Sequence, residues 1–159
     1  MGAAGFFGQP LGLAALALTG LYAAWTDLHH RRLPNWLCLL VAGAGLAWVL
    51  ALGGVGGAGS ALLHGALALT VGAALFMLGG LGGGDAKYYA AVACWFPLAS
   101  GLQLLMAVSL AGLVLALGWL TMQRLKRRLA DRANPDFALV PFGIAIAVGA
   151  VFAKAGWTA

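Results

Sequence analysis

Six apolar runs, separated by short polar loops, constrain this chain more than any other feature of its sequence. Hydrophobic residues make up 63% of the chain and charged residues only 8%, whereas charged residues form about a quarter of an ordinary soluble domain. A bilayer-spanning helix needs about 20 mainly apolar residues, and a helix satisfies its own backbone polar groups in lipid. We therefore predict an all-α, polytopic membrane helix bundle that forms a single integral-membrane domain over residues 1–159. About six transmembrane helices are expected, at about 5–25, 36–53, 60–80, 86–97, 101–122 and 138–157.

Two of the boundaries between these runs need separate comment. The segment Gly53–Gly57 contains four glycines in five residues, which predicts a flexible turn between the second and third spans. The fourth run, about 86–97, is too short to cross a bilayer comfortably. It either takes in residues of the glycine-rich turn before it or continues past Pro97.

The basic residues predict how the chain is oriented in the membrane. Lys and Arg accumulate in cytoplasmic loops, and eight of the nine basic residues here fall in the first, third and fifth loops. Lys154 is the exception. With six crossings, this asymmetry places both termini outside and the odd-numbered loops in the cytoplasm. Because the charges sit in short loops between apolar runs, we expect a lipid bilayer around the chain and no nucleic-acid partner. The eight residues are Arg31, Arg32, Lys87, Arg124, Lys126, Arg127, Arg128 and Arg132.

Two aspartates are conspicuous because the chain has only four acidic residues. Asp27 ends the first apolar run, and Asp85 follows Gly82, Gly83 and Gly84 directly after the third run. An ionisable residue in or beside lipid is costly and marks a functional site by default. The predicted topology brings both carboxylates to the cytoplasmic face, so they are candidates for a pair.

Two neighbouring carboxylates cannot both ionise cheaply, so they share a proton and titrate as a unit. The ionised member can act as general base on a water, and the protonated member can polarise a peptide carbonyl and protonate the leaving amine. Such peptide hydrolysis needs no metal and no cofactor. Two alternatives remain open at this point: a site that couples to ions, or structural helix caps. Asp85 suits an N-cap position, whereas Asp27 stands at the wrong end of its helix for one.

Several other polar residues have both a functional and a structural interpretation. Lys87 could bias the carboxylate pair or contact the substrate, or it could be an anchor that extends to the headgroups. Pro34 and Asn35 form the turn before the second span, with Asn35 as its N-cap. His64 is interpreted as a histidine at the outer interface. Cys38 and Cys94 form no CxxC pair and have no metal-ligand spacing, so we expect buried reduced thiols and no metal site.

Three segments resemble the signatures of the type IV prepilin peptidases. Asp27-Leu28-His29-His30-Arg31-Arg32-Leu33-Pro34-Asn35 resembles the first, in which an Asp after the first span precedes a basic stretch and an Ile/Leu-Pro-Asn. The second signature is GxGD with a Lys two residues after the Asp, and it is resembled by Gly82-Gly83-Gly84-Asp85-Ala86-Lys87. Val140-Pro141-Phe142-Gly143-Ile144-Ala145-Ile146-Ala147 resembles the closing span. GxGD alone is weak in a chain with 25 glycines, but the three segments in this order are specific.

The resemblance implies a membrane aspartic endopeptidase of the bacterial inner (cytoplasmic) membrane that removes the basic leader from prepilins or pseudopilins. It implies Asp27 and Asp85 as the catalytic pair, with Gly82, Gly83, Gly84, Lys87, Pro34 and Asn35 in substrate-binding or supporting roles. The chain lacks the cysteine-rich insertion of larger relatives, so it resembles the small form associated with Flp-type (tight adherence) pili, and we do not expect N-methyltransferase activity. The alternative is a small proton- or ion-coupled transporter or a non-enzymatic membrane assembly subunit. The sequence assigns no oligomeric state.

Overall fold

The computed structural model describes residues 3–30, 33–129 and 142–157 of the chain. Every regular element in these residues is helical, which confirms the predicted all-α class. The elements are α1 (Ala3–His30), α2 (Asn35–Met77), α3 (Gly83–Ala93), a 3₁₀ turn η1 (Leu98–Ser100), α4 (Gly101–Leu129) and α5 (Phe142–Trp157). The last expected span began at about residue 138, and its first residues lie outside the described part.

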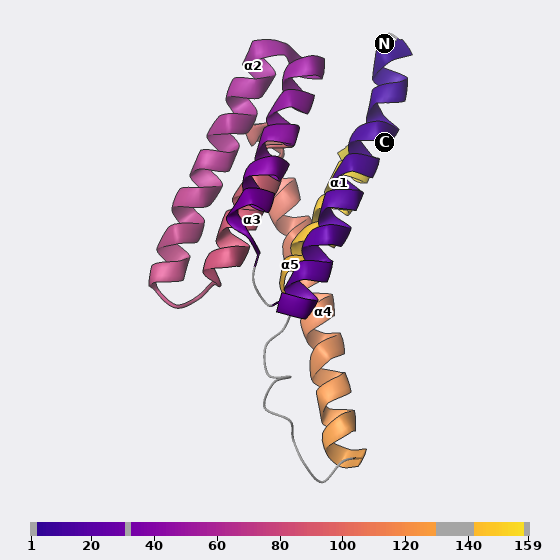
Figure 1. Cartoon of the computed structure of the whole chain (residues 1–159), viewed down its shortest axis with the longest axis vertical. Coiled ribbons are helices and arrows are strands. Elements are labelled where there is room, and N and C mark those ends of the chain that lie inside the picture. The colour runs from indigo at the N-terminus through magenta and orange to yellow at the C-terminus, as the bar shows by residue number, and fades with distance from the viewer. Residues whose placement is uncertain (1–2, 31–32, 130–141, 158–159) are drawn as a thin grey trace.

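The helix α2 is a hairpin of two limbs rather than one continuous rod (Figure 1). Its backbone leaves the helical conformation at Gly54, where φ is +62° and ψ is −166°. A positive φ is strained for residues that carry a Cβ atom, so glycine is suited to this reversal. The predicted turn at Gly53–Gly57 is therefore confirmed, and the two limbs correspond to the second and third expected spans.

The short helix α3 resolves the uncertain fourth run. It begins at Gly83, inside the glycine-rich turn, and ends at Ala93, before Pro97. Eleven helical residues extend about 16 Å, roughly half the thickness of the hydrocarbon core. The helix therefore takes in residues of the glycine-rich turn, one of the two expected alternatives, and it is too short to cross a bilayer alone, as its run of 86–97 indicated.

The exposed surfaces of the long helices favour a lipid environment over the interior of a soluble protein. Among the described residues, Asn35–Met77 and Leu98–Met122 are long and apolar enough to cross a membrane, and Phe142–Gly156 is a shorter apolar helix. Only 17% of the most apolar stretch of each long helix is buried. Large apolar side chains on α2 and α4 are therefore left facing outward, as lipid allows and water penalises.

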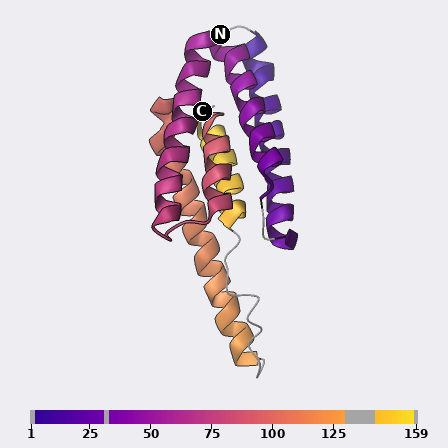
Figure 2. The same cartoon turned by 60° about the vertical axis from the view of Figure 1, so that its left-hand side comes forward.

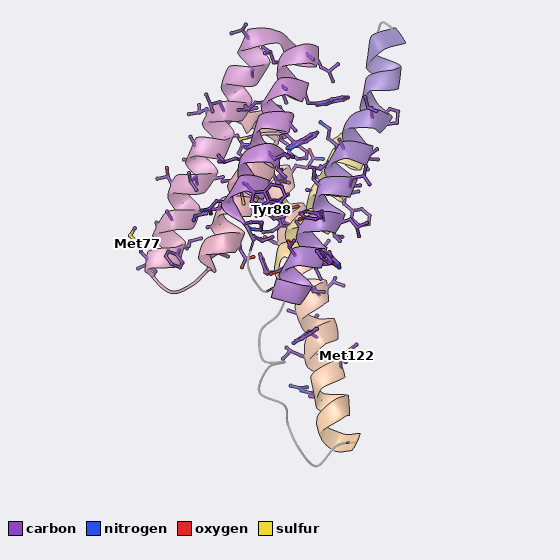
Figure 3. The ribbon with its side chains drawn as sticks, in the orientation of Figure 1. Met77, Tyr88 and Met122 are labelled. Atoms are coloured by element: carbon purple, nitrogen blue, oxygen red, sulfur yellow. The ribbon has the colours of Figure 1, made fainter. Side chains whose placement is uncertain are left out.

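The core lies where α3 packs between α2 and α5, and Trp95, Tyr88 and Phe96 are its largest fully buried side chains. Figure 3 shows Tyr88 directed into the centre of the bundle. The indole Nε1 of Trp95 donates a hydrogen bond of 2.9 Å to the carbonyl of Val41 in the first limb of α2. This contact fixes the end of α3 against α2.

Because α3 ends inside the bundle, the backbone carbonyls after it need partners. Nδ1 of His64 lies 3.1 Å from the carbonyl of Phe96, and Nζ of Lys154 donates to the carbonyl of Trp95 across 3.5 Å. Both side chains are buried. The interpretation of His64 as an interfacial residue is therefore wrong. It and Lys154 are internal residues that satisfy buried backbone carbonyls.

The ends of the helices gather the sequence signatures at one end of the bundle. The last turn of α1, the turn at residues 78–82 and the start of α5 lie at the lower end in Figures 1 and 2, and the Gly54 turn lies at the upper end. The helix α4 continues past the other helices at the lower end, where it carries the exposed Met122 (Figure 3). The candidate catalytic residues therefore sit at the base of the packed region.

Candidate active site

Asp27 lies near the C-terminal end of α1 and contacts the beginning of α5. Its Oδ2 accepts a hydrogen bond of 3.0 Å from the backbone N–H of Gly143, the second residue of α5. Backbone N–H groups in the first turn of a helix have no partner within that helix, and the helix dipole there favours a negative charge. Asp27 therefore caps α5 from another helix, a role that its own position at the end of α1 did not indicate.

Asp85 is the third residue of α3 and is only partly exposed. Gly82, not Asp85, is the N-cap of α3, so the interpretation of Asp85 as an N-cap residue is wrong. A Cβ atom on Gly82 would lie 2.7 Å from Oδ2 of Asp85. The carboxylate therefore folds back over the glycine turn, and any side chain at position 82 would displace it.

The electrostatics of Asp85 connect the two aspartates. Asp85 lies outside the segments that are long and apolar enough to cross a bilayer. Burial is the larger cause that raises the pKa of its carboxyl from 3.8 to about 6, and the negative charge of Asp27 is the second cause. The two carboxylates thus lie within electrostatic reach of each other. An ionised Asp27, held by a helix N-terminus, favours a protonated Asp85.

Lys87 joins α3 to the beginning of α2. Its Nζ donates a hydrogen bond of 3.2 Å to Oδ1 of Asn35. The N-cap of α2 is Pro34, and Asn35 is the first helical residue, so the prediction of Asn35 as N-cap is wrong. Lys87 therefore links the two signature segments.

The glycines before Asp85 pack tightly against neighbouring segments. A Cβ atom on Gly83 would lie 3.2 Å from the ring of Phe76 at the end of α2, and one on Gly84 would lie 3.7 Å from Cβ of Leu33. Leu33 directly precedes Pro34. The glycine turn thus brings the first and second signatures into contact, although they lie far apart in the sequence.

Two hollows adjoin these residues. Asp85 lies in the wall of an apolar groove of about 480 Å³ that is bounded by residues from α2, α3, α4 and α5. A second hollow of about 470 Å³ lies beside Thr26, the neighbour of Asp27, between Tyr22, Trp25, Pro34 and Trp36. One hollow is thus lined by Asp85 itself and the other by the residue next to Asp27.

The structure brings the predicted site residues into two connected groups. Asp27 and Asp85 are coupled by charge, while Pro34, Asn35 and Lys87 form the adjoining junction with the glycine turn. Gly143 had no role assigned from the sequence, and the only signal for it was its place in the Pro-Phe-Gly start of the last apolar run. Within the described ranges, no group of three or more His, Cys, Asp or Glu side chains is arranged to hold a metal ion.

Comparison with known protein families gives a match. The family model described as the type IV leader peptidase family matches residues 14–117, a range that contains Asp27, the glycine turn and Asp85. No curated protein and no solved structure matches the chain significantly. The matched range ends before α5, so it does not include Gly143.

Proposed function

Because the chain belongs to the type IV leader peptidase family, we propose that it is a membrane aspartic endopeptidase whose catalytic pair is Asp27 and Asp85. Burial raises the pKa of Asp85 and the charge of Asp27 raises it further, and this coupling of the two carboxyl groups is the single observation that carries the assignment. The proposed substrate is a prepilin or pseudopilin of the Flp type, cleaved between its basic leader and its apolar helix.

The surroundings of the two carboxyl groups support different roles for them. Asp27 accepts the N–H of Gly143 at the start of α5, an environment that stabilises a carboxylate. Asp85 is partly buried and has a pKa of about 6. In the resting enzyme we therefore assign Asp27 as the ionised general base and Asp85 as the protonated general acid.

The proposed reaction balances its protons between these two groups. Asp27 takes one proton from a water molecule as the water oxygen attacks the carbonyl carbon of the scissile peptide. Asp85 gives its proton to the carbonyl oxygen, so a neutral gem-diol forms. The proton on Asp27 then passes to the leaving nitrogen as the C–N bond breaks, and Asp85 recovers a proton from the collapsing diol. The products are a carboxylic acid and an amine, and no metal takes part.

The proposed location is the cytoplasmic face of a bacterial inner membrane, with the chain crossing several times. The gathering of Asp27, the glycine turn and the start of α5 at one end of the bundle supports this arrangement. The exposed Arg124 on the extended part of α4 supports the same orientation, because basic residues favour the cytoplasmic side. Family membership favours this peptidase over an ion-coupled transporter or an assembly subunit.

Co-expression with a candidate Flp-type prepilin tests the proposal. The leader is lost in the presence of the wild-type chain, and the prepilin moves faster on a gel. Asp27→Asn and Asp85→Asn each abolish this shift while the protein still inserts into the membrane. Asp131→Asn and Asp136→Asn, which change the other two acidic residues of the chain, serve as matched controls and retain it. Leader removal by an inserted Asp27→Asn or Asp85→Asn variant contradicts the proposal.

A further inference from the structure

The groove beside Asp85 runs along α3 toward the upper end of the bundle. On the second limb of α2 its wall includes His64, Ala68 and Leu75, whose spacing of four and seven residues places them along one side of a helix. On α4 the wall includes Leu105 and Ser109, again four residues apart. Each of these two walls therefore follows one face of a helix, as a site for a further helix would.

The two ends of the groove differ in chemistry. His64 and Gly101 lie at the end where α3 terminates, and the ring of His64 is already bonded to a backbone carbonyl. Asp85 and Phe142 lie at the opposite end, where α3 and α5 begin. Among the described residues that line the groove, Asp85 supplies the only carboxylate. From His64 to Leu75 the wall extends about 16 Å, enough for about eleven residues of a helix.

We infer that this groove receives the first turns of the apolar helix of the substrate, so that the peptide bond before that helix lies at Asp85. The inference rests on the proposed function. Chemical complementarity specifies the occupant and its direction: an apolar helix fits the apolar walls, and the basic leader that precedes it meets the negative charge of Asp27 near Asp85. The groove is also continuous with the proposed active site, because Asp85 belongs to both.

A second groove of similar size provides an internal control. It has a volume of about 500 Å³, lies between α4 and α5, and is lined by apolar residues and Gln103. No carboxylate lines it in the part of the chain that the structure describes. A helix or lipid chain that binds any apolar groove should occupy both grooves. The substrate helix should instead bind only the groove that leads to Asp85.

Photocrosslinking tests the position of the helix without requiring cleavage. A photoreactive amino acid replaces Val71 in the first groove or Val114 in the second, two valines that are 51% and 64% exposed. The full-length chain carries Asp27→Asn, so that bound prepilin is not consumed. The Val71 probe should label the first eleven or so residues of the apolar segment, and the Val114 probe should not. Equal labelling from both positions, or labelling of lipid alone at Val71, overturns the inference.

Cleavage by two matched variants tests the same point in an active enzyme. Ala68 lines the first groove and Ala107 the second, and both are partly buried residues that pack against the core. Ala68→Trp should lower kcat/KM for full-length prepilin by about tenfold or more, mainly through KM, and Ala107→Trp by less than about threefold. Equal rates for wild type and Ala68→Trp overturn the groove assignment but leave the peptidase intact.

The two failures remain distinguishable. If the wild-type chain cleaves no prepilin, the proposed function fails, whatever the groove binds. If Ala68→Trp does not insert or accumulate, the crosslinks from Val71 and Val114 decide the question, because their side chains point outward and tolerate replacement better.

Discussion

The backbone N–H of Gly143 donates a hydrogen bond to Oδ2 of Asp27, so the first turn of the last helix holds a carboxylate from the end of the first helix. This contact joins segments that are 116 residues apart. It gives Asp27 a fixed position and a stabilised negative charge. Burial raises the pKa of Asp85 and the charge of Asp27 raises it further, so the start of α5 contributes indirectly to the protonation of the second aspartate.

Gly143→Ala should disturb this contact. A Cβ atom at position 143 would lie 2.8 Å from Oδ2 of Asp27 and 3.2 Å from its Cγ, so the carboxylate must move. We expect kcat/KM to fall by about tenfold to a hundredfold, because a small displacement of a reacting group is costly. Gly43→Ala is the control, since a Cβ atom there meets nothing within 4 Å. A Gly143→Ala enzyme as active as this control would contradict the role of Asp27 as a positioned base.

The pH dependence of cleavage should report the protonation of Asp85. As the general acid it must carry a proton, and its pKa is about 6. In the free enzyme, kcat/KM should therefore fall by about tenfold per pH unit above pH 6. An apolar substrate helix that covers the groove removes water from Asp85, so the corresponding fall in kcat should begin at a higher pH. A kcat/KM that is constant from pH 6 to pH 8 would exclude Asp85 as an acid with this pKa.

The stability of the protein should show the same titration with a defined sign. Because folding raises the pKa of Asp85 from 3.8 to about 6, the folded state binds more protons than the unfolded state in this window. This group therefore contributes stability at low pH that is lost as the pH rises toward 6 and beyond. Asp85→Asn should raise the free energy of unfolding at pH 8 by roughly 1–2 kcal/mol after allowance for solvent screening.

The same Asp85→Asn variant should have almost no effect on stability at pH 4, where most of the folded carboxyl is already protonated. Thermal melts of the purified protein at the two pH values make the comparison. A variant that is equally stabilised at both would show that the gain arises from packing and not from the carboxylate charge.

Lys154 should prove to be a structural residue of the bundle. Its Nζ donates to the carbonyl of Trp95 and lies 5.3 Å from the centre of the Phe96 ring. Lys154→Met leaves that buried carbonyl without its donor and should cost about 1–3 kcal/mol of stability, whereas Lys154→Arg should retain most of it. Thr70→Val is the control, because Thr70 is exposed and its hydroxyl bonds within its own helix. Equal melting temperatures for Lys154→Met and this control would contradict the role of Lys154 as the donor to the Trp95 carbonyl.

The sequence predicted the helical class and the turn between the second and third apolar runs well, because both depend on local properties. The helical class was predictable because the surface of each helix that faces lipid must be apolar, and hydropathy detects this. The turn was predictable because four glycines within residues 53–57 favour a reversal of the chain whatever surrounds them. The length of α3 was harder to predict. An apolar run does not reveal whether its terminal carbonyls face lipid or are satisfied inside the bundle, as His64 and Lys154 satisfy those after α3.

The candidate site was predictable as a set of residues but not as an arrangement. Scarce carboxylates beside lipid indicated Asp27 and Asp85, and the predicted topology brought them to one face. Their partners depend on tertiary contacts. Gly143 reaches Asp27 only because α1 packs on α5, and Asn35 accepts from Lys87 because α2 and α3 begin side by side. The helix caps at Gly82 and Pro34 differ from those expected, and neither residue makes a side-chain capping hydrogen bond.

The most direct test of the central claim, that Asp27 and Asp85 act as one coupled pair, is the titration of the Asp85 carboxyl with and without the charge of Asp27. Carbon NMR of labelled aspartate, assigned with Asp85→Asn, gives the pKa of Asp85 in each protein. We expect a pKa near 6 in the wild-type chain and a clearly lower value in Asp27→Asn, which still inserts but no longer cleaves. An unchanged pKa in Asp27→Asn would contradict the pair.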